Sequence, residues 1–170
     1  MFFIGGYMGR FFEKISFEQF KKDISDDRML YDSIKLPERS TIKSAGYDIR
    51  SMEDGIIKPG EYKRFKTGLK VAMEDDEVLY IYSRSSLGYK HGVTMVNSVG
   101  VIDADFYNNI DNEGHFSVCL INQGTEDFEI KIGDRIAQGV FMKYLTVDNE
   151  KKNDKVRVGG FGSTNKKGND

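Results

Sequence analysis

Residues 97–106 of the chain read Asn97-Ser98-Val99-Gly100-Val101-Ile102-Asp103-Ala104-Asp105-Phe106. The apolar run is too short for a helix and has β-branched residues on both sides of a glycine, which predicts a strand or a tight hairpin. A central glycine lets backbone N–H and C=O groups come close to a ligand, and the carboxylate at the end of the run could act on it. Read alone, the stretch also fits a hairpin with a solvated acidic tip.

Short apolar runs separated by turn residues surround this stretch from residue 33 onward. Many short strands at such spacing predict an all-β jelly roll or distorted barrel. The run 116–122 alternates in side-chain character, as a half-buried strand should. The predicted strands are 33–36, 47–51, 62–73, 78–83, 93–97, 116–122, 128–130 and 135–144.

The N-terminal region has a helical pattern instead. Ser16 and Gln19 have the spacing of a capping box, and Phe17, Phe20 and Ile24 fall on one helical face. These residues predict a short amphipathic helix packed against the main body. The predicted parts of the chain are an N-terminal extension (1–32), a β-barrel core (33–147) and a polar, glycine-containing, mobile C-terminal arm (148–170).

Composition excludes several classes of protein. The chain has 170 residues with 25 basic and 27 acidic side chains, a balance that argues against nucleic-acid or membrane-surface binding by bulk charge. One cysteine cannot form an internal disulfide, so we expect a reducing, cytoplasmic setting. Two histidines and one cysteine make a structural zinc site improbable.

An anion cradle is predicted where Arg84, Ser85 and Ser86 follow a strand and precede a glycine. The guanidinium offers a bidentate donor fork for phosphate oxygens, and hydroxyl and loop N–H groups add donors. A polar turn explains the same residues equally well. No GxxxxGK[ST] sequence is present, so the segment is not a P-loop.

Two further segments place polar residues beside strands. Asp48 follows Gly46 and could orient a neighbouring loop, although simple strand entry explains it too. A turn at Gly133 and Asp134 feeds a strand in which Gln138 lies among apolar residues, so this side chain requires a hydrogen-bond partner.

The last segment is Arg157-Val158-Gly159-Gly160-Phe161-Gly162-Ser163-Thr164. A phenylalanine among glycines in a polar tail can fold over a ligand and stack on a planar ring, while the arginine and hydroxyls reach an anion. A flexible linker is the alternative. The segments together indicate a nucleoside triphosphate site with water as the nucleophile.

In this order, the segments resemble the motifs of the trimeric dUTP pyrophosphatases (dUTPases) over residues 34–164, most specifically at 98–103 and 159–164. The resemblance implies a jelly-roll subunit, dUTP as substrate, and a homotrimer whose active sites combine several subunits. It assigns recognition of the base to Asn97, Gly100, Val101 and Ile102, packing against the sugar to Phe106, and activation of water to Asp103 with Gln138 nearby. Phosphate contacts fall to Arg84, Ser85 and Ser86, and supporting roles to Asp48 and Asp134. Closure of the C-terminal arm falls to Arg157, Phe161, Gly162, Ser163 and Thr164.

The resemblance also implies a mechanism. Mg²⁺ would be held by the triphosphate and water, with no direct protein ligand. Asp103 would position water for in-line attack at the α-phosphorus, giving dUMP and diphosphate, and closure of the arm would exclude bulk water. Such an enzyme keeps uracil out of DNA and supplies dUMP.

This sequence departs from the family pattern at several points. Phe106 stands where tyrosine is usual, and residues 107–115 form an insertion in which an asparagine could occupy a left-handed turn position. Arg157 lies four residues before Phe161 where many members have five, so Lys155 is a second candidate for the γ-phosphate. Asn165 replaces a usual glycine.

Two alternatives remain open. A dCTP deaminase on the same fold needs a glutamate on the strand after the hairpin, where this chain has Cys119; Glu113 lies in the insertion instead. A non-catalytic nucleotide-sensing member would bind nucleotide without turnover. Intact Asp103 and Gln138 argue against that second reading.

Overall fold

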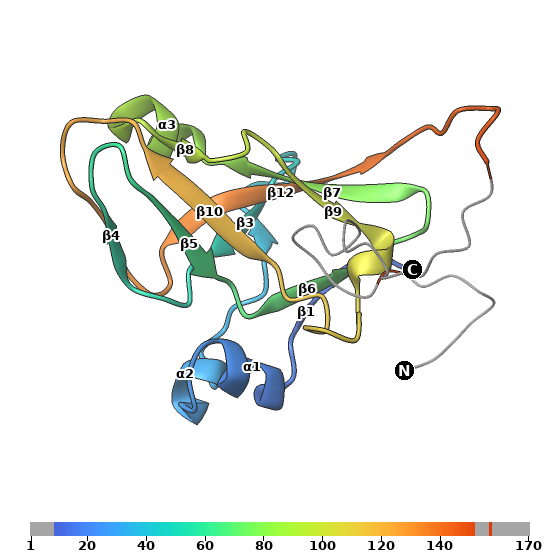
Figure 1. Cartoon of the computed structure of the whole chain (residues 1–170), viewed down its shortest axis with the longest axis horizontal. Coiled ribbons are helices and arrows are strands. Elements are labelled where there is room, and N and C mark those ends of the chain that lie inside the picture. Colours follow the sequence, from blue (N-terminus) through green and yellow to red (C-terminus); the bar gives the residue numbers. More distant parts are fainter. Residues whose placement is uncertain (1–8, 152–156, 158–170) are drawn as a thin grey trace, which may run out of the picture.

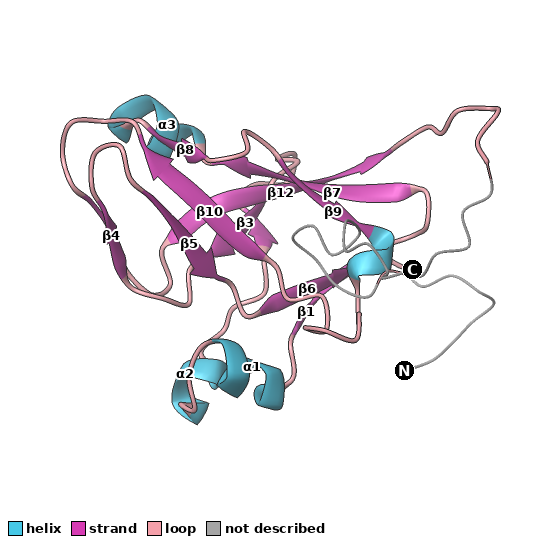
Figure 2. Cartoon of the chain, in the orientation of Figure 1, coloured by secondary structure: helices cyan, strands magenta, loops and turns pink. Residues whose placement is uncertain are grey.

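The computed structural model describes residues 9–151 and 157. The predictions on Lys155, Phe161, Gly162, Ser163 and Thr164 lie outside these residues. Strands dominate the described part, and the helices lie at its periphery (Figures 1 and 2). The predicted all-β class is therefore confirmed.

The strand bounds are β1 (Phe11–Lys14), β2 (Glu38–Arg39), β3 (Tyr47–Arg50), β4 (Gly55–Ile57), β5 (Tyr62–Lys66), β6 (Leu69–Ala72), β7 (Glu77–Ser83), β8 (Val93–Met95), β9 (Gly100–Asp103), β10 (Ser117–Asn122), β11 (Phe128–Ile130) and β12 (Arg135–Lys143). The helices are α1 (Phe17–Asp23), α2 (Arg28–Asp32), α3 (Ser85–His91) and a 3₁₀ turn (Ala104–Phe106). No helix within residues 9–151 is long and apolar enough to cross a membrane.

The strands pair antiparallel in several sheets. The largest has the order β2-β3-β12-β7-β9, so its neighbours come from distant parts of the sequence. A second has the order β5-β10-β8, and two-stranded sheets pair β1 with β6 and β11 with β4. These non-sequential neighbours are typical of a jelly roll.

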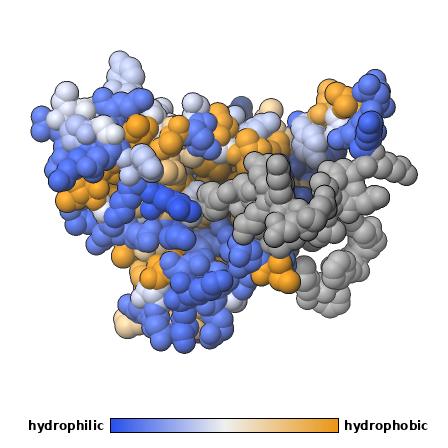
Figure 3. Space-filling model, in the orientation of Figure 1, coloured by the Kyte–Doolittle hydropathy of each residue, from blue (hydrophilic) through white to orange (hydrophobic). Residues whose placement is uncertain are grey.

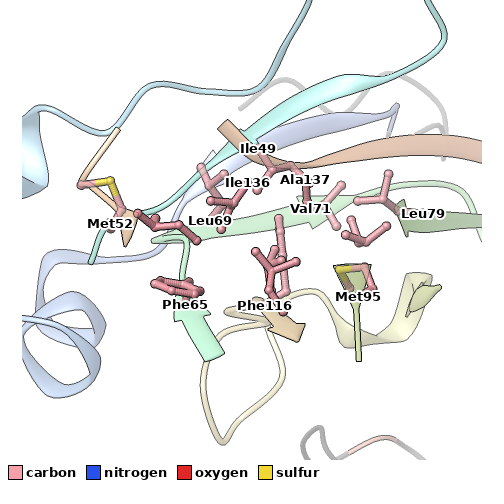
Figure 4. Close-up of a cluster of buried hydrophobic side chains, with 14 of the residues drawn as sticks. Ile49, Met52, Phe65, Leu69, Val71, Leu79, Met95, Phe116, Ile136 and Ala137 are labelled. Carbon is pink, nitrogen blue, oxygen red and sulfur yellow. The ribbon is translucent and has the colours of Figure 1, made fainter. Parts of the chain in front are cut away.

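The inner faces of the sheets enclose an apolar core (Figure 4). On β10, Val118 and Leu120 are fully buried whereas Cys119 and Ile121 are partly exposed, which confirms the predicted alternation. Phe65 and Phe116 are also buried at 0% and 1% exposure.

The predicted N-terminal helix is confirmed as α1. The Ser16 hydroxyl caps it by accepting a hydrogen bond from the Gln19 N–H at 3.1 Å, and Phe20 is fully buried. The reciprocal half of the capping box does not form, because the Gln19 side chain donates to Asp23 at 2.9 Å. The outer surface of this helical lobe is mostly hydrophilic (Figure 3).

Several predicted elements were wrong. Residues 33–36 form no strand, because helix α2, capped by Asp27, occupies the preceding residues and the next strand begins at Glu38. The segment 62–73 is divided at Gly68, whose φ of +70° interrupts the strand. Helix α3 replaces the predicted polar loop after Arg84, and β1 and β4 were not anticipated.

Candidate active site

The predicted hairpin borders a cavity of about 370 Å³ between β9 and β10. Many of the predicted base- and sugar-binding residues lie around it, together with residues from the facing strands. The predicted residues that line it are Asn97, Gly100, Val101, Ile102, Asp103, Phe106 and Arg157. The residues that line the cavity but were not predicted from the sequence include Ile81, Met95, Phe116, Ser117 and Cys119.

A tight turn leads into β9, and the packing of this strand against β7 explains the glycine at its start. The Ser98 N–H donates to the Met95 carbonyl at 3.1 Å, and Ser98 adopts a left-handed φ of +61°. Gly100 pairs with Ile81, and a Cβ at Gly100 would lie 3.0 Å from the Ile81 Cβ. A larger residue would therefore push β9 away from β7 or fill the cavity.

Phe106 closes one end of the cavity from the 3₁₀ turn. It is 7% exposed, and the side-chain amide of Asn109 donates to its carbonyl at 2.8 Å. Phe116 borders the same cavity from the start of β10. Two aromatic rings thus flank the loop 107–115 on its two sides.

Arg157, which lines the cavity, binds two carboxylates. The Arg157 guanidinium donates from Nη2 to Asp103 Oδ2 at 2.5 Å and from Nε to Asp105 Oδ1 at 2.6 Å. The Asp103 side chain is half exposed, so it is accessible from the cavity and from solvent. Asp105 was not among the predicted site residues, and only its place two residues after Asp103 could have suggested it.

A second polar group, the Asp48 cluster, consists of Asp48, Arg84, Arg135 and Ser40. Asp48 Oδ1 accepts from Arg84 Nε at 3.1 Å, and Oδ2 accepts from Arg135 Nη1 at 3.0 Å and from the Ser40 hydroxyl at 2.8 Å. Burial alone would raise the pKa of Asp48, but these hydrogen bonds and the charge of Arg84 outweigh burial and lower it. The orienting role expected of Asp48 fits this geometry, whereas Arg135 was missed.

Gln138 lies beside this cluster, opposite Asp48 on β3 and Tyr82 on β7. Its amide donates to the Ser83 carbonyl at 3.3 Å, so the predicted partner is present. A Cβ at Gly46 would approach the Gln138 amide oxygen to 2.5 Å, which explains the small residue before Tyr47.

The remaining predicted residues are spread around the same end of the sheet. Ser85 and Ser86 form the first turn of α3, directly after Arg84. Asp134 accepts the Lys131 N–H at 2.8 Å and so fixes the turn before β12. Its contacts are those of a turn-forming residue.

The apolar wall of the cavity at Ile81 and the Asp48 cluster lie on opposite faces of one sheet. Ile81, which borders the cavity, pairs with Gly100 on one side and Gly139 on the other. The next residue, Tyr82, points to the other face and pairs with Gln138. The Asp103 carboxylate lies on the same face as Gln138, but it pairs with Val78, four residues from Tyr82 along β7, so roughly 13 Å of strand separates the two residues.

Comparison with known proteins agrees with this architecture. The sequence profile of the dUTPase family matches residues 32–165. The deoxyuridine 5'-triphosphate nucleotidohydrolase of Lactococcus lactis is 51% identical over 132 residues, covering 77% of this chain and 88% of the relative. That of Nautilia profundicola is 42% identical, covering 77% and 91%.

The chain belongs to the dUTPase family. The crystal structure of dUTPase from Streptococcus mutans is similar with a TM-score of 0.66 and 39% identity, covering 81% of this chain and 98% of that one. A mutant dUTPase from phage phi11 of S. aureus shares the fold at 23% identity, with a TM-score of 0.61 over 75% and 95% of the two chains; that structure concerns coordination of a structural Mg(II) ion. The family resemblance is thus confirmed, and the N-terminal residues 9–31 precede the range matched by the dUTPase profile.

Proposed function

We propose that this dUTPase-family chain hydrolyses dUTP to dUMP and diphosphate. The observation that carries the proposal is a cavity bordered by a glycine-containing backbone turn and ending at an accessible carboxylate, Asp103. The family membership of the chain supplies the substrate, because the similar proteins named above are deoxyuridine 5'-triphosphate nucleotidohydrolases.

Uracil recognition would rest on backbone groups of β9 together with Asn97. Donors and acceptors fixed in a strand can match the edge of uracil and mismatch that of cytosine, as in base pairing. A wall set by Gly100 against Ile81 leaves little freedom for a 5-methyl group. Backbone recognition also explains why the side chain of Val101 can be 58% exposed.

Phe106 would select the sugar. Its buried ring at the end of the cavity offers a flat apolar surface for deoxyribose, and a 2′-hydroxyl there would lose hydrogen bonds to water without gaining a partner. The ring has no hydroxyl of its own, so packing alone carries this selection.

Asp103 would orient and deprotonate the attacking water. Arg157 donates to Asp103 Oδ2, and phosphate oxygens would compete for this guanidinium when substrate enters. Release of Arg157 would leave the carboxylate free to accept from water. The proton then passes to Asp103, and diphosphate leaves from the α-phosphorus.

The phosphate contacts would come from a second copy of the chain. Arg84, with Ser85, Ser86 and Gln138, lies at the Tyr82 end of β7, whereas Asp103 pairs with Val78 roughly 13 Å along the strand, and this separation favours two chains at one nucleotide. A closed assembly such as a homotrimer would bring the cavity of one copy to the Asp48 cluster of another. The closing role of residues 157–164 belongs to the same proposal.

Mg²⁺ fits this arrangement as a partner of the substrate. Among residues 9–151 and 157, no three acidic, histidine or cysteine side chains gather into a metal-binding group. The Asp48 carboxylate already accepts from two arginines and a serine. The hard oxygens of the triphosphate and water would hold the ion, which would neutralise phosphate charge.

Deamination of dCTP is less compatible with the cavity. The β10 wall carries Ser117 and Cys119 and no acid between residues 117 and 121. The Glu113 carboxylate is engaged by Ser16 and Lys70 in the loop outside β10. A proton shuttle for C4 of cytosine is therefore not provided by these residues.

The decisive experiment measures diphosphate release from dUTP, dTTP, dCTP and UTP by the wild type and by Asp103→Asn, with Mg²⁺ present. We expect turnover of dUTP in preference to the other nucleotides, and a loss of about 10²–10⁴-fold in kcat for the variant. Asp127→Asn, an exposed carboxylate far along the chain from the cavity, is the matched control. Equal rates in wild type and Asp103→Asn, or ammonia release from dCTP, would refute the proposal.

A further inference from the structure

The N-terminal segment 9–24 contacts one particular loop of the core. That loop, residues 107–115, joins Phe106 to Phe116, and both of these border the cavity. The segment precedes the residues matched by the dUTPase profile. Its contacts with the loop are therefore a feature of this chain that the family assignment does not explain.

Glu113 is the centre of these contacts. Its Oε2 accepts the Ser16 N–H at 2.9 Å, and its Oε1 accepts the Ser16 hydroxyl at 2.5 Å. Lys70, on β6, reaches Glu113 Oε2 at 3.3 Å and the Asn108 side-chain oxygen at 2.7 Å. One carboxylate thus joins the start of α1, the loop and the core sheet.

Further contacts hold the two ends of the loop. The Tyr107 hydroxyl donates to Glu13 Oε2 at 2.6 Å, and its ring meets that of Phe11 edge-on at 6.0 Å. At the other end, buried His115 contacts Asp23 through Nδ1 at 2.6 Å and accepts the Gly68 N–H at Nε2 at 3.0 Å. The N-terminal segment therefore contacts the loop at both of its ends, next to Phe106 and next to Phe116.

The backbone of the loop requires such support. Asn108 and Glu113 have left-handed φ values of +53° and +59°. Asparagine tolerates this conformation, whereas a glutamate rarely adopts it unless its surroundings hold it. Asn109 is 7% exposed, and its side-chain amide donates to the Phe106 carbonyl. This hydrogen bond connects the conformation of the loop to the position of Phe106. Loosening the loop would therefore loosen the aromatic end of the cavity.

We propose that residues 9–24 form a brace for the loop 107–115, and that Glu113 is a positioning residue that fixes Phe106 for selection of the sugar. The link to sugar selection rests on the proposed function, whereas the link to the order of Phe106 rests on the contacts alone. Glu113 acts through Ser16 and the loop backbone and touches no reacting atom. The brace gives a role to the N-terminal extension within this chain's own site.

The test compares Glu113→Gln with Glu129→Gln, a matched change at an exposed carboxylate paired with Lys131 on β11. For Glu113→Gln we expect the ratio of kcat/KM for dUTP over UTP to fall by roughly five- to tenfold, the effect of one or two lost hydrogen bonds. The fall should come mainly from a higher kcat/KM for UTP, because a looser Phe106 penalises the 2′-hydroxyl less. Amide exchange of residues 104–107 should rise, while exchange of β10 stays unchanged.

If Glu113→Gln fails to fold, Tyr107→Phe gives a second variant, because it keeps the ring and removes the hydroxyl that donates to Glu13. Two results would overturn the proposal. One is an unchanged ratio of kcat/KM for dUTP over UTP with amide exchange altered equally throughout the chain. The other is a lower melting temperature with no other change, because the contacts would then contribute only to general stability. If the wild type hydrolyses neither nucleotide, the proposed function fails, and exchange of residues 104–107 still decides whether the brace orders Phe106.

Discussion

The cavity beside β9 and the Asp48 cluster belong to one sheet but are held by different forces. Backbone hydrogen bonds and close packing against Ile81 shape the cavity, and its polar discrimination would come from main-chain groups. Charge shapes the cluster, where one carboxylate binds two arginines. The cavity should therefore be sensitive to added volume, and the cluster to lost charge.

The separation of the two regions along the sheet leads to the largest expected effect. Asp103→Asn and Gln138→Ala should each be nearly inactive alone. Oligomers assembled from both variants should regain about a quarter of the wild-type rate, because each half of a shared site is intact in about half of the subunits. Steady-state dUTP hydrolysis after co-expression checks this.

Separate oligomers of the two variants, mixed without subunit exchange, serve as the control for this experiment. Their activity should equal the sum of the two residual rates. Co-assembled oligomers that also show only this sum would mean that both regions serve one nucleotide within one chain, and the separation of the two regions would lose its functional meaning.

Removal of charge from the cluster should have the next largest effect. Arg84→Gln would remove a charged donor from the phosphates and one partner of Asp48, so we expect KM for dUTP to rise roughly 10–100-fold, as charge-assisted hydrogen bonds of 1.5–3 kcal/mol imply. Arg64→Gln, on β5, is a control for the loss of one arginine elsewhere. Titration of KM against salt would show the loss as a weaker ionic-strength dependence, and an unaltered KM would contradict the cradle.

Added volume should act on the cavity instead. Gly100→Ala places a methyl group 3.0 Å from the Ile81 Cβ, so we expect a destabilisation of about 1–3 kcal/mol and a higher KM for dUTP. The matched control is Gly88→Ala in α3, where the added methyl group meets only ordinary van der Waals contacts. Gly60→Ala is unsuitable because Gly60 has a left-handed φ of +79°. Chemical denaturation measures the difference, and equal stability of Gly100→Ala and wild type would show that β9 can move.

The smallest expected effect is a loss of stability in acid to which the Asp48 cluster contributes. The pKa of Asp48 is lowered below its ordinary 3.8 in the folded chain. Its stabilising contribution is therefore complete above that value and is lost as pH falls from 3.8 through the folded pKa. Melting curves should show that Asp48→Asn loses less stability than the wild type over this acid range, while Gly100→Ala follows the wild type.

Local patterns in the sequence predicted the parts of the fold that depend on local physics. The capping serine at residue 16 and the alternation along 116–122 are short-range signals, and both were confirmed. The strand β1 was missed because its sequence, Phe11-Phe12-Glu13-Lys14, does not alternate, and its pairing with β6 is a long-range contact. Helix α3 was missed because its serines and glycine are poor helix formers, so the sequence favours a turn.

The candidate site was predictable as a set of residues but not as an arrangement. Turn glycines, a carboxylate after an apolar run and a polar residue in an apolar strand pointed to Gly100, Asp103 and Gln138. Sheet order decides which of them share a face, and no short-range pattern encodes that order. The same limit applies to Ser16 and Glu113, which are distant in sequence and joined only by the fold.

Strand β9 has a consequence beyond catalysis. It ends the sheet order β2-β3-β12-β7-β9, so among the described strands none covers its outer edge in that sheet. Uncovered strand edges are templates for association between molecules, and short length and nearby acids are common protections. A base bound to the same backbone groups would cover this edge, so bound nucleotide would also oppose self-association of the stored protein.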